Sequence, residues 1–121
     1  MTYESETVVA SQVAEGVSYT VAKLSFARRM ELMRRVRDLA RRLEFLEAGE
    51  EAAGTMESGL LRAEVDRLFL TWGLRAVSGL AIDGEAATPE LLAEAGPENL
   101  FREAVAAVRA AAGLNASERK N

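Results

Sequence analysis

Apolar residues recur with a helical period along residues 26–48. The spacing from Leu32 to Leu46 is four, three, four and three residues, which places these side chains on one face of a helix. Ser25 is a favourable N-cap, and neither Gly nor Pro interrupts the segment before Gly49. The pattern predicts an amphipathic helix over residues 26–48, with an apolar stripe formed by Leu32, Val36, Leu39, Leu43 and Leu46.

The same period returns further along the chain. A second helix is predicted over residues 58–78 from its apolar residues, Leu61, Val65, Leu68 and Trp72. Gly73 lies within this helix and costs about 1 kcal/mol relative to Ala, which predicts a close packing contact there. Gly79 suits the C′ position that ends a helix. The Gly-rich acidic segment 48–59 is predicted to be a loop.

Residues 7–24 alternate in places between apolar and polar positions. Val17, Tyr19 and Val21 fall on one side of a strand, and residues of this kind favour a pleated surface. Ala-Glu-Gly at 14–16 is a turn signal. The pattern predicts a β-hairpin over residues 7–24, with strands near 7–13 and 17–24. Two strands alone are marginally stable, so the hairpin must pack on helices or join the sheet of another chain.

Turn and cap signals dominate from residue 79 onward. Asp83-Gly84 predicts a tight turn. Thr88-Pro89-Glu90 combines an N-cap, a first-turn proline and an acid at the positive end of the helix dipole. Gly96-Pro97 separates this helix from the next. The two helices are predicted over residues 89–95 and 97–112.

Together these elements predict a mainly α fold with three to four helices and an N-terminal β-hairpin packed on them. The 121 residues suit one domain, which we place at residues 1–114, followed by a polar tail at 115–121. A chain of this length buries roughly two thirds of its unfolded surface, so it can hold a hydrophobic core without disulfides.

Composition excludes much of the usual catalytic and metal-binding chemistry. The chain has no Cys and no His, so disulfides, thiolates, the main zinc ligands and the commonest general base are missing. Asp83 and Glu85 are paired carboxylates, but the sequence after them does not continue a calcium-loop pattern, and a plain turn is the better interpretation. We expect no enzymatic activity, no cofactor and no metal.

Membrane insertion is not expected either. No apolar run approaches the roughly 20 residues that span a bilayer, and the acidic N-terminal sequence differs from a signal peptide. We therefore expect a soluble cytoplasmic protein without a membrane partner.

Charge is distributed unevenly along the chain. The net charge is −4, yet residues 23–48 carry eight bases and four acids and contribute +4. A basic face can bind phosphates, but the interleaved acids and the lack of alternating aromatic residues disfavour nucleic acid. Arginine is also favoured in protein interfaces, because its planar guanidinium group pairs with carboxylates in a bidentate manner. Contact with protein is therefore the preferred interpretation.

The candidate binding residues come from the two long predicted helices. Methionine side chains adapt to varied partners, although core filling is their commoner role. Trp72 is included on the condition that it is exposed, because a lone Trp on a helical stripe is usually a core residue. The candidate protein-binding residues are Met30, Met33, Arg34, Arg37, Arg41 and Trp72.

Several short motifs follow one another through the sequence, mostly in its last third. They are Leu24–Leu32, Trp72-Gly73, Gly79-Leu80-x-Ile82-Asp83-Gly84, Thr88-Pro89-Glu90, Gly96-Pro97 and Glu118-Arg119-Lys120-Asn121. In this combination, over residues 17–121, the chain resembles the tail assembly chaperones of bacteriophages and prophages. Ala87 stands where many relatives have Pro, a departure that loosens one loop.

The resemblance implies a non-enzymatic role in the cytoplasm of a bacterial host. Such chaperones coat the long, helical tape measure protein before tail tube subunits polymerise around it, and they do not remain in the finished particle. The implied partners are the tape measure protein and the tail tube protein, and a homo-oligomer stays open. The alternatives are a structural tail or connector subunit of the virion and, less favoured, a small nucleic-acid-binding regulator.

Overall fold

The computed structural model describes residues 1–48 and 52–113. Within these residues the chain forms four helices, a three-stranded antiparallel sheet and a separate two-stranded hairpin. In chain order the elements are β1 (Glu6–Ala10), β2 (Ser18–Ala22), α1 (Phe26–Ala48), α2 (Ala52–Gly73), β3 (Leu74–Ser78), β4 (Ala81–Ile82), β5 (Glu85–Ala86), α3 (Pro89–Ala95) and α4 (Glu98–Ala111).

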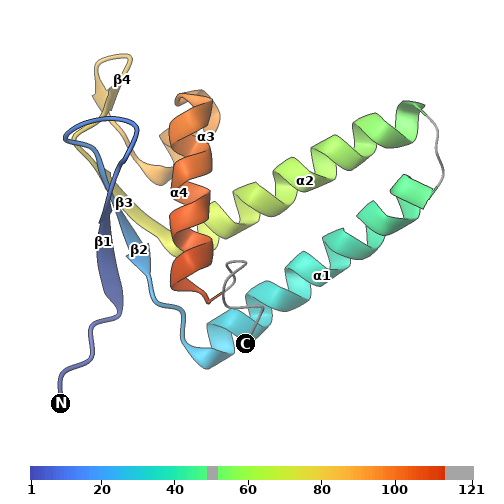
Figure 1. Ribbon diagram of the computed structural model, residues 1–121, viewed down its shortest axis with the longest axis horizontal. Helices are drawn as coiled ribbons and strands as arrows, with labels where there is room; N and C mark the ends of the chain where they lie inside the picture. Colours follow the sequence, from blue (N-terminus) through green and yellow to red (C-terminus); the bar gives the residue numbers. More distant parts are fainter. Residues whose placement is uncertain (49–51, 114–121) are drawn as a thin grey trace.

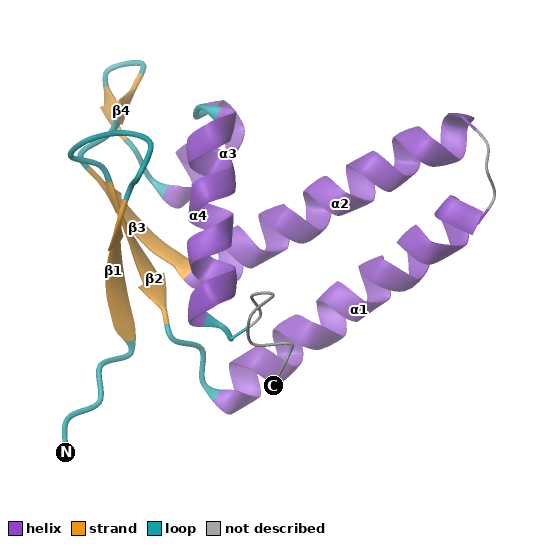
Figure 2. Cartoon of the chain, viewed as in Figure 1, coloured by secondary structure: helices purple, strands orange, loops and turns teal. Residues whose placement is uncertain are grey.

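The molecule has two parts, which are visible in Figure 1. At one end α4 lies against the sheet and contacts β2 and β3, and α3 packs beside it. At the other end α1 and α2 form a long antiparallel pair that projects away from the sheet. Figure 2 shows that the strands gather at the first end, while α1 and α2 form the projecting part.

The structure bears out the predicted helices and N-terminal hairpin in part, and the fold class is mixed α/β rather than clearly mainly α. The N-terminal hairpin and the helices are present, but the sheet has a third strand where the sequence pattern predicts the end of a helix. Residues 74–78 form β3, in which Val77 pairs with Tyr19 and Leu74 pairs with Val21 of β2. The β1–β2 hairpin would be only marginally stable on its own. With β3 it becomes a three-stranded sheet that has a buried face.

The predicted close contact at Gly73 is confirmed. A Cβ atom at this position would lie 2.2 Å from Cγ1 of Val108, so α2 and α4 meet where only glycine fits.

The prediction for Gly79 is wrong, because this residue follows a strand and does not cap a helix. Its φ is 80°, and a Cβ there would lie 2.0 Å from the carbonyl oxygen of Gly16. Gly79 therefore allows β3 to end against the β1–β2 turn.

The second helix begins earlier than expected. α2 starts at Ala52, so part of the segment predicted as a loop is helical, in keeping with the high helix propensity of alanine. The bounds of α1 and α3 agree with the predicted ranges 26–48 and 89–95. The stop signal at Gly49 and the polar tail at 115–121 lie outside the described residues.

The predicted N-cap at Thr88 and the predicted turn at Asp83-Gly84 are confirmed. The Thr88 hydroxyl accepts a hydrogen bond from the backbone N–H of Leu91 at 3.0 Å, as an N-cap does. Asp83 and Gly84 both have positive φ, of 51° and 82°, and join β4 to β5 in a tight two-residue turn. This turn exposes Asp83 and Glu85 at its surface.

The hydrophobic core lies between the inner face of the sheet, the base of α1 and the two helices α2 and α4. Tyr19 and Val21 of β2 project into it and are completely buried. Leu32 of α1, Leu70 of α2 and Val108 of α4 complete its centre, each at most 1% exposed. The core thus anchors the first turns of α1 and the last turns of α2, leaving their connected ends to project.

Candidate protein-binding surface

The predicted apolar stripe of α1 is an internal seam. We call α1 and α2 together the helical arm. Leu32 is fully buried at its base, and the stripe residues nearer the connection, such as Leu39 and Leu43, are only half-buried. The stripe faces the apolar side of α2, with which α1 makes extensive contact. The stripe holds α1 and α2 together, so a partner protein must bind other faces of the arm. The side chain of Leu46 lies outside the described part of the chain.

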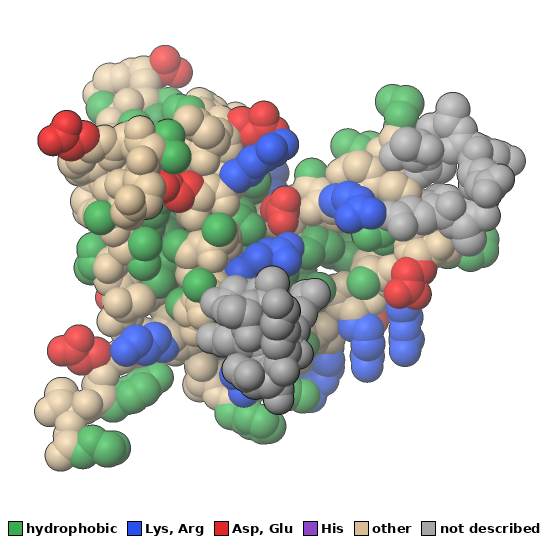
Figure 3. Space-filling view, viewed as in Figure 1, with side chains coloured by type: hydrophobic (Ala, Val, Ile, Leu, Met, Phe, Trp, Pro, Cys, Tyr) green, Lys and Arg blue, Asp and Glu red, His purple; other side chains and the backbone are tan. Residues whose placement is uncertain are grey.

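The opposite side of α1 carries most of the predicted binding residues. Met30, Arg34, Arg37, Arg41 and Phe45 recur every three to four residues and define what we call the outer ridge. All five are exposed, with Met30 at 40% and Phe45 at 79%. Three arginines therefore lie between two exposed apolar side chains, over about 22 Å of helix. Figure 3 shows basic side chains projecting from the margin of the arm.

The charges of the outer ridge are only partly compensated within the chain. Glu31 pairs with Arg34 at 2.7 Å and with Arg35 at 3.5 Å, and Arg37 lies 3.9 Å from Asp38. Exposed pairs of this kind contribute about 0–1 kcal/mol and exchange partners readily. Arg41 forms no ion pair with any residue that the structure describes. The ridge can therefore offer its guanidinium groups to carboxylates of another protein.

The far end of the arm exposes further apolar side chains. Met56 and Leu60 of α2 are 74% and 61% exposed, at the same end of the arm as Phe45. A shallow hollow of about 350 Å³, lined by Arg41, Arg42, Phe45 and Glu57, lies between the helices there. Exposed apolar groups that gather at one end of a projecting element are typical of an interaction surface. This end, which we call the arm tip, continues the outer ridge.

Two predicted binding residues point inward. Met33 is half-buried and packs against the core. Trp72 is also half-buried, with the guanidinium carbon of Arg28 4.2 Å and that of Arg35 5.4 Å from its ring centroid. The condition of exposure that was set for Trp72 is not met. These cation–π contacts connect α1 to α2 and stabilise the arm.

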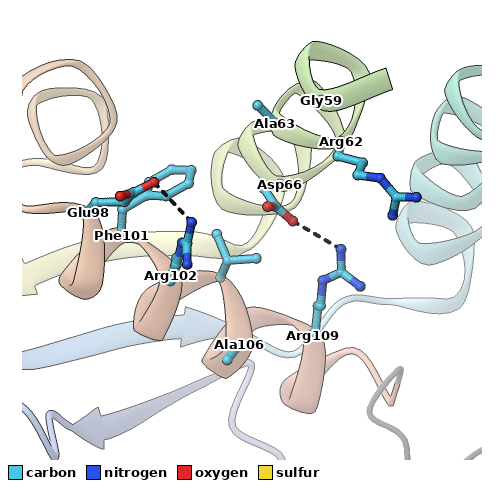
Figure 4. Close-up of a pocket in the computed structure, with 10 residues that line it drawn as sticks. Gly59, Arg62, Ala63, Asp66, Glu98, Phe101, Arg102, Ala106 and Arg109 are labelled. Atoms are coloured by element: carbon cyan, nitrogen blue, oxygen red, sulfur yellow. Dashed lines mark hydrogen bonds and ion pairs between the residues drawn. The ribbon is translucent and has the colours of Figure 1, made fainter. Parts of the chain in front are cut away.

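A second concave surface, which the sequence pattern did not indicate, lies between α2 and α4. It is a groove of about 570 Å³ whose lining is drawn in Figure 4. Asp66 of α2 and Arg109 of α4 point toward each other and are 3.1 Å apart, and Glu98 pairs with Arg102 along α4 at 3.1 Å. Arg109 also lies over the Phe69 ring at 4.4 Å. The Asp66–Arg109 pair joins α2 to α4, while the Glu98–Arg102 pair lies along α4 at the edge of the groove.

The Glu103 carboxylate holds α4 on the sheet. Glu103 accepts hydrogen bonds from the Ser11 hydroxyl, from the Gln12 backbone N–H at 2.8 Å and from the Tyr19 hydroxyl at 2.8 Å. Desolvation by itself would raise the pKa of Glu103, but these hydrogen bonds outweigh it and the pKa is lowered. Burial, followed by the bond to Glu103, raises the pKa of Tyr19 to about 12. All three donors serve to position α4.

No protein-family model, curated protein or solved structure matches this chain. None of the described helices has the length and apolar character needed to cross a membrane. Among the described residues, no group of three or more Asp and Glu side chains is arranged to hold a metal ion.

Proposed function

We propose that this protein is a tail assembly chaperone of a bacteriophage or prophage and that it binds the tape measure protein through its helical arm. The main observation behind the proposal is the outer ridge, where Arg34, Arg37 and Arg41 lie exposed between Met30 and Phe45. The resemblance of the motifs named above to those of tail assembly chaperones supports it.

The motif residues and the ridge have different roles in this proposal. Gly79–Gly84 and Thr88–Glu90 build the end of the sheet, the β4–β5 turn and the start of α3. These elements form the base that carries the arm. The ridge projects from that base, which can therefore present it to a client.

The ridge suits a helical client physically. An amphipathic helix lying along α1 would place apolar side chains against Met30, Phe45 and the arm tip, and carboxylates against the arginines. Each contact is small and exposed, so a single chaperone binds weakly. Many copies along one long client would keep it soluble, and polymerising tail tube subunits could displace them one at a time.

The test is co-expression with the tape measure protein encoded in the same genome. The wild-type chain is expected to keep this client soluble and to co-purify with it. The ridge variant Arg34→Gln/Arg37→Gln/Arg41→Gln should lose most of the co-purification. The matched control is Arg67→Gln/Arg75→Gln/Arg102→Gln, which removes three similarly exposed arginines from other faces and gives the same net charge. This control should retain the client.

Two results would contradict the proposal. One is a tape measure protein that stays insoluble, and absent from the purified fraction, whether or not the wild-type chain is present. The other is an equal loss of client with the ridge variant and with the control, since net charge and not the ridge would then govern binding.

A structural tail or connector subunit is the second candidate, and the sheet favours it. β1 and β3 are the terminal strands of the three-stranded sheet, so successive subunits could join head to tail into a ring. Mass spectrometry of purified particles separates the candidates, because a chaperone should be absent from the virion and a connector should be present in stoichiometric amount.

A further inference from the structure

Among the residues that the structure describes, β1 pairs with β2 alone and is an edge strand of the sheet. The strand order is β1-β2-β3, and Figure 1 shows β1 at the outer margin of the sheet. An edge strand exposes a row of unpaired backbone groups, which proteins commonly protect with Lys, Pro or a bulge. β1 has the sequence ETVVA, and its pairing with β2 is regular throughout. Val8, at its centre, is 66% exposed.

The ladder shows which backbone groups face outward. The N–H of Lys23 donates to the carbonyl of Ser5, and the N–H of Ser11 donates to the carbonyl of Val17. Hydrogen-bonded positions alternate along an antiparallel strand, so Thr7 and Val9 direct their N–H and C=O groups toward β2. It follows that Glu6, Val8 and Ala10 direct theirs away from the sheet.

We propose that β1 pairs antiparallel with β1 of a second copy of this chain, with Val8 opposite Val8 on the two-fold axis. In this register Glu6 of one copy faces Ala10 of the other. Every outward N–H and C=O of the three residues then finds a partner, because all three occupy hydrogen-bonding positions in both strands. The two sheets become one continuous six-stranded sheet. This inference is independent of the chaperone proposal.

Side-chain chemistry selects a second copy as the occupant of this edge. The register brings the two exposed Val8 side chains together and removes apolar surface from water. It also keeps Glu6 of one strand away from Glu6 of the other, and Glu6 already has Arg75 of its own chain within 3.9 Å. The self-pairing therefore involves no facing like charges. Since the strand has only five residues, the interface is small and the dimer is expected to be weak.

Backbone protection tests the register directly. Amide hydrogen exchange of the full chain is measured at micromolar and millimolar concentration, together with sedimentation equilibrium. We expect the Val8 amide to exchange freely in the monomer and to become protected as the dimer forms. The Thr7 amide, bonded to β2, should be protected at both concentrations and serves as the internal control.

Two opposite substitutions at one exposed position test the side-chain pairing. Ala10→Lys places an ammonium group opposite Glu6 of the second copy at both ends of the interface and should tighten the dimer roughly fivefold. Ala10→Glu should weaken it by about the same factor. Both effects should fade at high salt. Adding Glu6→Ala to Ala10→Lys should remove the gain.

A backbone variant completes the set. Val8→Pro deletes an N–H that faces away from β2, so circular dichroism should show an intact fold while the dimer is abolished. The proposal is overturned by a chain that stays monomeric at millimolar concentration, by a dimer whose Val8 amide exchanges freely, or by Ala10→Lys and Ala10→Glu shifting the equilibrium in the same direction. Protection of Val8 only after a tape measure segment is added to a monomeric chain would also overturn self-pairing, while leaving the chaperone proposal standing.

Discussion

The Tyr19 hydroxyl of β2 donates a hydrogen bond of 2.8 Å to the Glu103 carboxylate of α4. Tyr19 is completely buried, and Glu103 also accepts hydrogen bonds from Ser11 and the Gln12 backbone. One acid thus ties α4 both to the central strand and to the β1–β2 turn. These hydrogen bonds hold α4 on the sheet at the base of the molecule, from which the helical arm projects.

Replacing Glu103 should remove a pH-dependent part of the stability. Hydrogen bonding lowers the pKa of Glu103 in the folded chain from its ordinary value of 4.5, so folding favours the charged carboxylate. This stabilisation is fully present above pH 4.5 and is lost as pH falls through the lower folded-state pKa. Urea unfolding at several acidic pH values should therefore show a steeper loss of unfolding free energy for the wild type than for Glu103→Gln.

The control for this experiment is Glu85→Gln, which removes an exposed carboxylate on β5 and gives the same net charge. Its pH profile should follow that of the wild type. Parallel profiles for Glu103→Gln and the wild type would contradict the assigned role of the Glu103 hydrogen bonds.

Gly73→Ala should destabilise the fold through a clash with Val108. The new methyl group would lie 2.2 Å from Cγ1 of Val108, and overpacking of this kind typically costs about 1–3 kcal/mol. The better helix propensity of alanine offsets part of this cost. Chemical denaturation should show a lower midpoint. In a Val108→Ala background the same substitution should cost much less, and equal costs in both backgrounds would refute the predicted contact.

The seam and the outer ridge of α1 should respond differently to truncation. Leu32→Ala removes a fully buried side chain and should cost about 2–5 kcal/mol of unfolding free energy. Phe45→Ala, at an exposed position on the same helix, should change stability by less than about 0.5 kcal/mol. It should instead reduce client binding in the co-expression assay. A large loss of stability with Phe45→Ala would show that this side chain belongs to the core and not to the binding surface.

The fluorescence of Trp72 should report the contact between Arg28 and its ring. Trp72 is the single Trp of the chain, and the Arg28 guanidinium carbon lies 4.2 Å from the ring centroid. Arg28→Met should shift the emission spectrum and lower the unfolding free energy by about 0.5–1 kcal/mol. Arg34→Met, on the outer ridge, should leave the spectrum unchanged. An unaltered spectrum in Arg28→Met would count against the stacked arrangement.

Features that depend on neighbouring residues were predictable from the sequence. The bounds of α1 and α3, the Thr88 cap and the Asp83-Gly84 turn each follow from side-chain chemistry within a few positions. The close contact at Gly73 was also predictable, because a glycine inside a helical pattern needs a steric reason, although its partner Val108 was not. Of the six predicted binding residues, four lie on the exposed ridge, and their role in binding stays a prediction.

Contacts between segments that are distant in sequence became known only from the tertiary structure. Residues 74–78 continue an apolar helical pattern, yet pairing with β2 makes them a strand, because hydrogen bonds to a distant strand outweigh local propensity. Three further features likewise depend on residues far along the chain. They are the close approach of Gly79 to Gly16, the inward position of Trp72 and the hydrogen bond between Tyr19 and Glu103. The sequence by itself determined α1, α3, the Thr88 cap and the Asp83-Gly84 turn, since their energetics are local, whereas both ends of α2 differ from the predicted range. The third strand, the internal seam of the arm and the open edge of β1 arose from packing between elements, which no local pattern encodes.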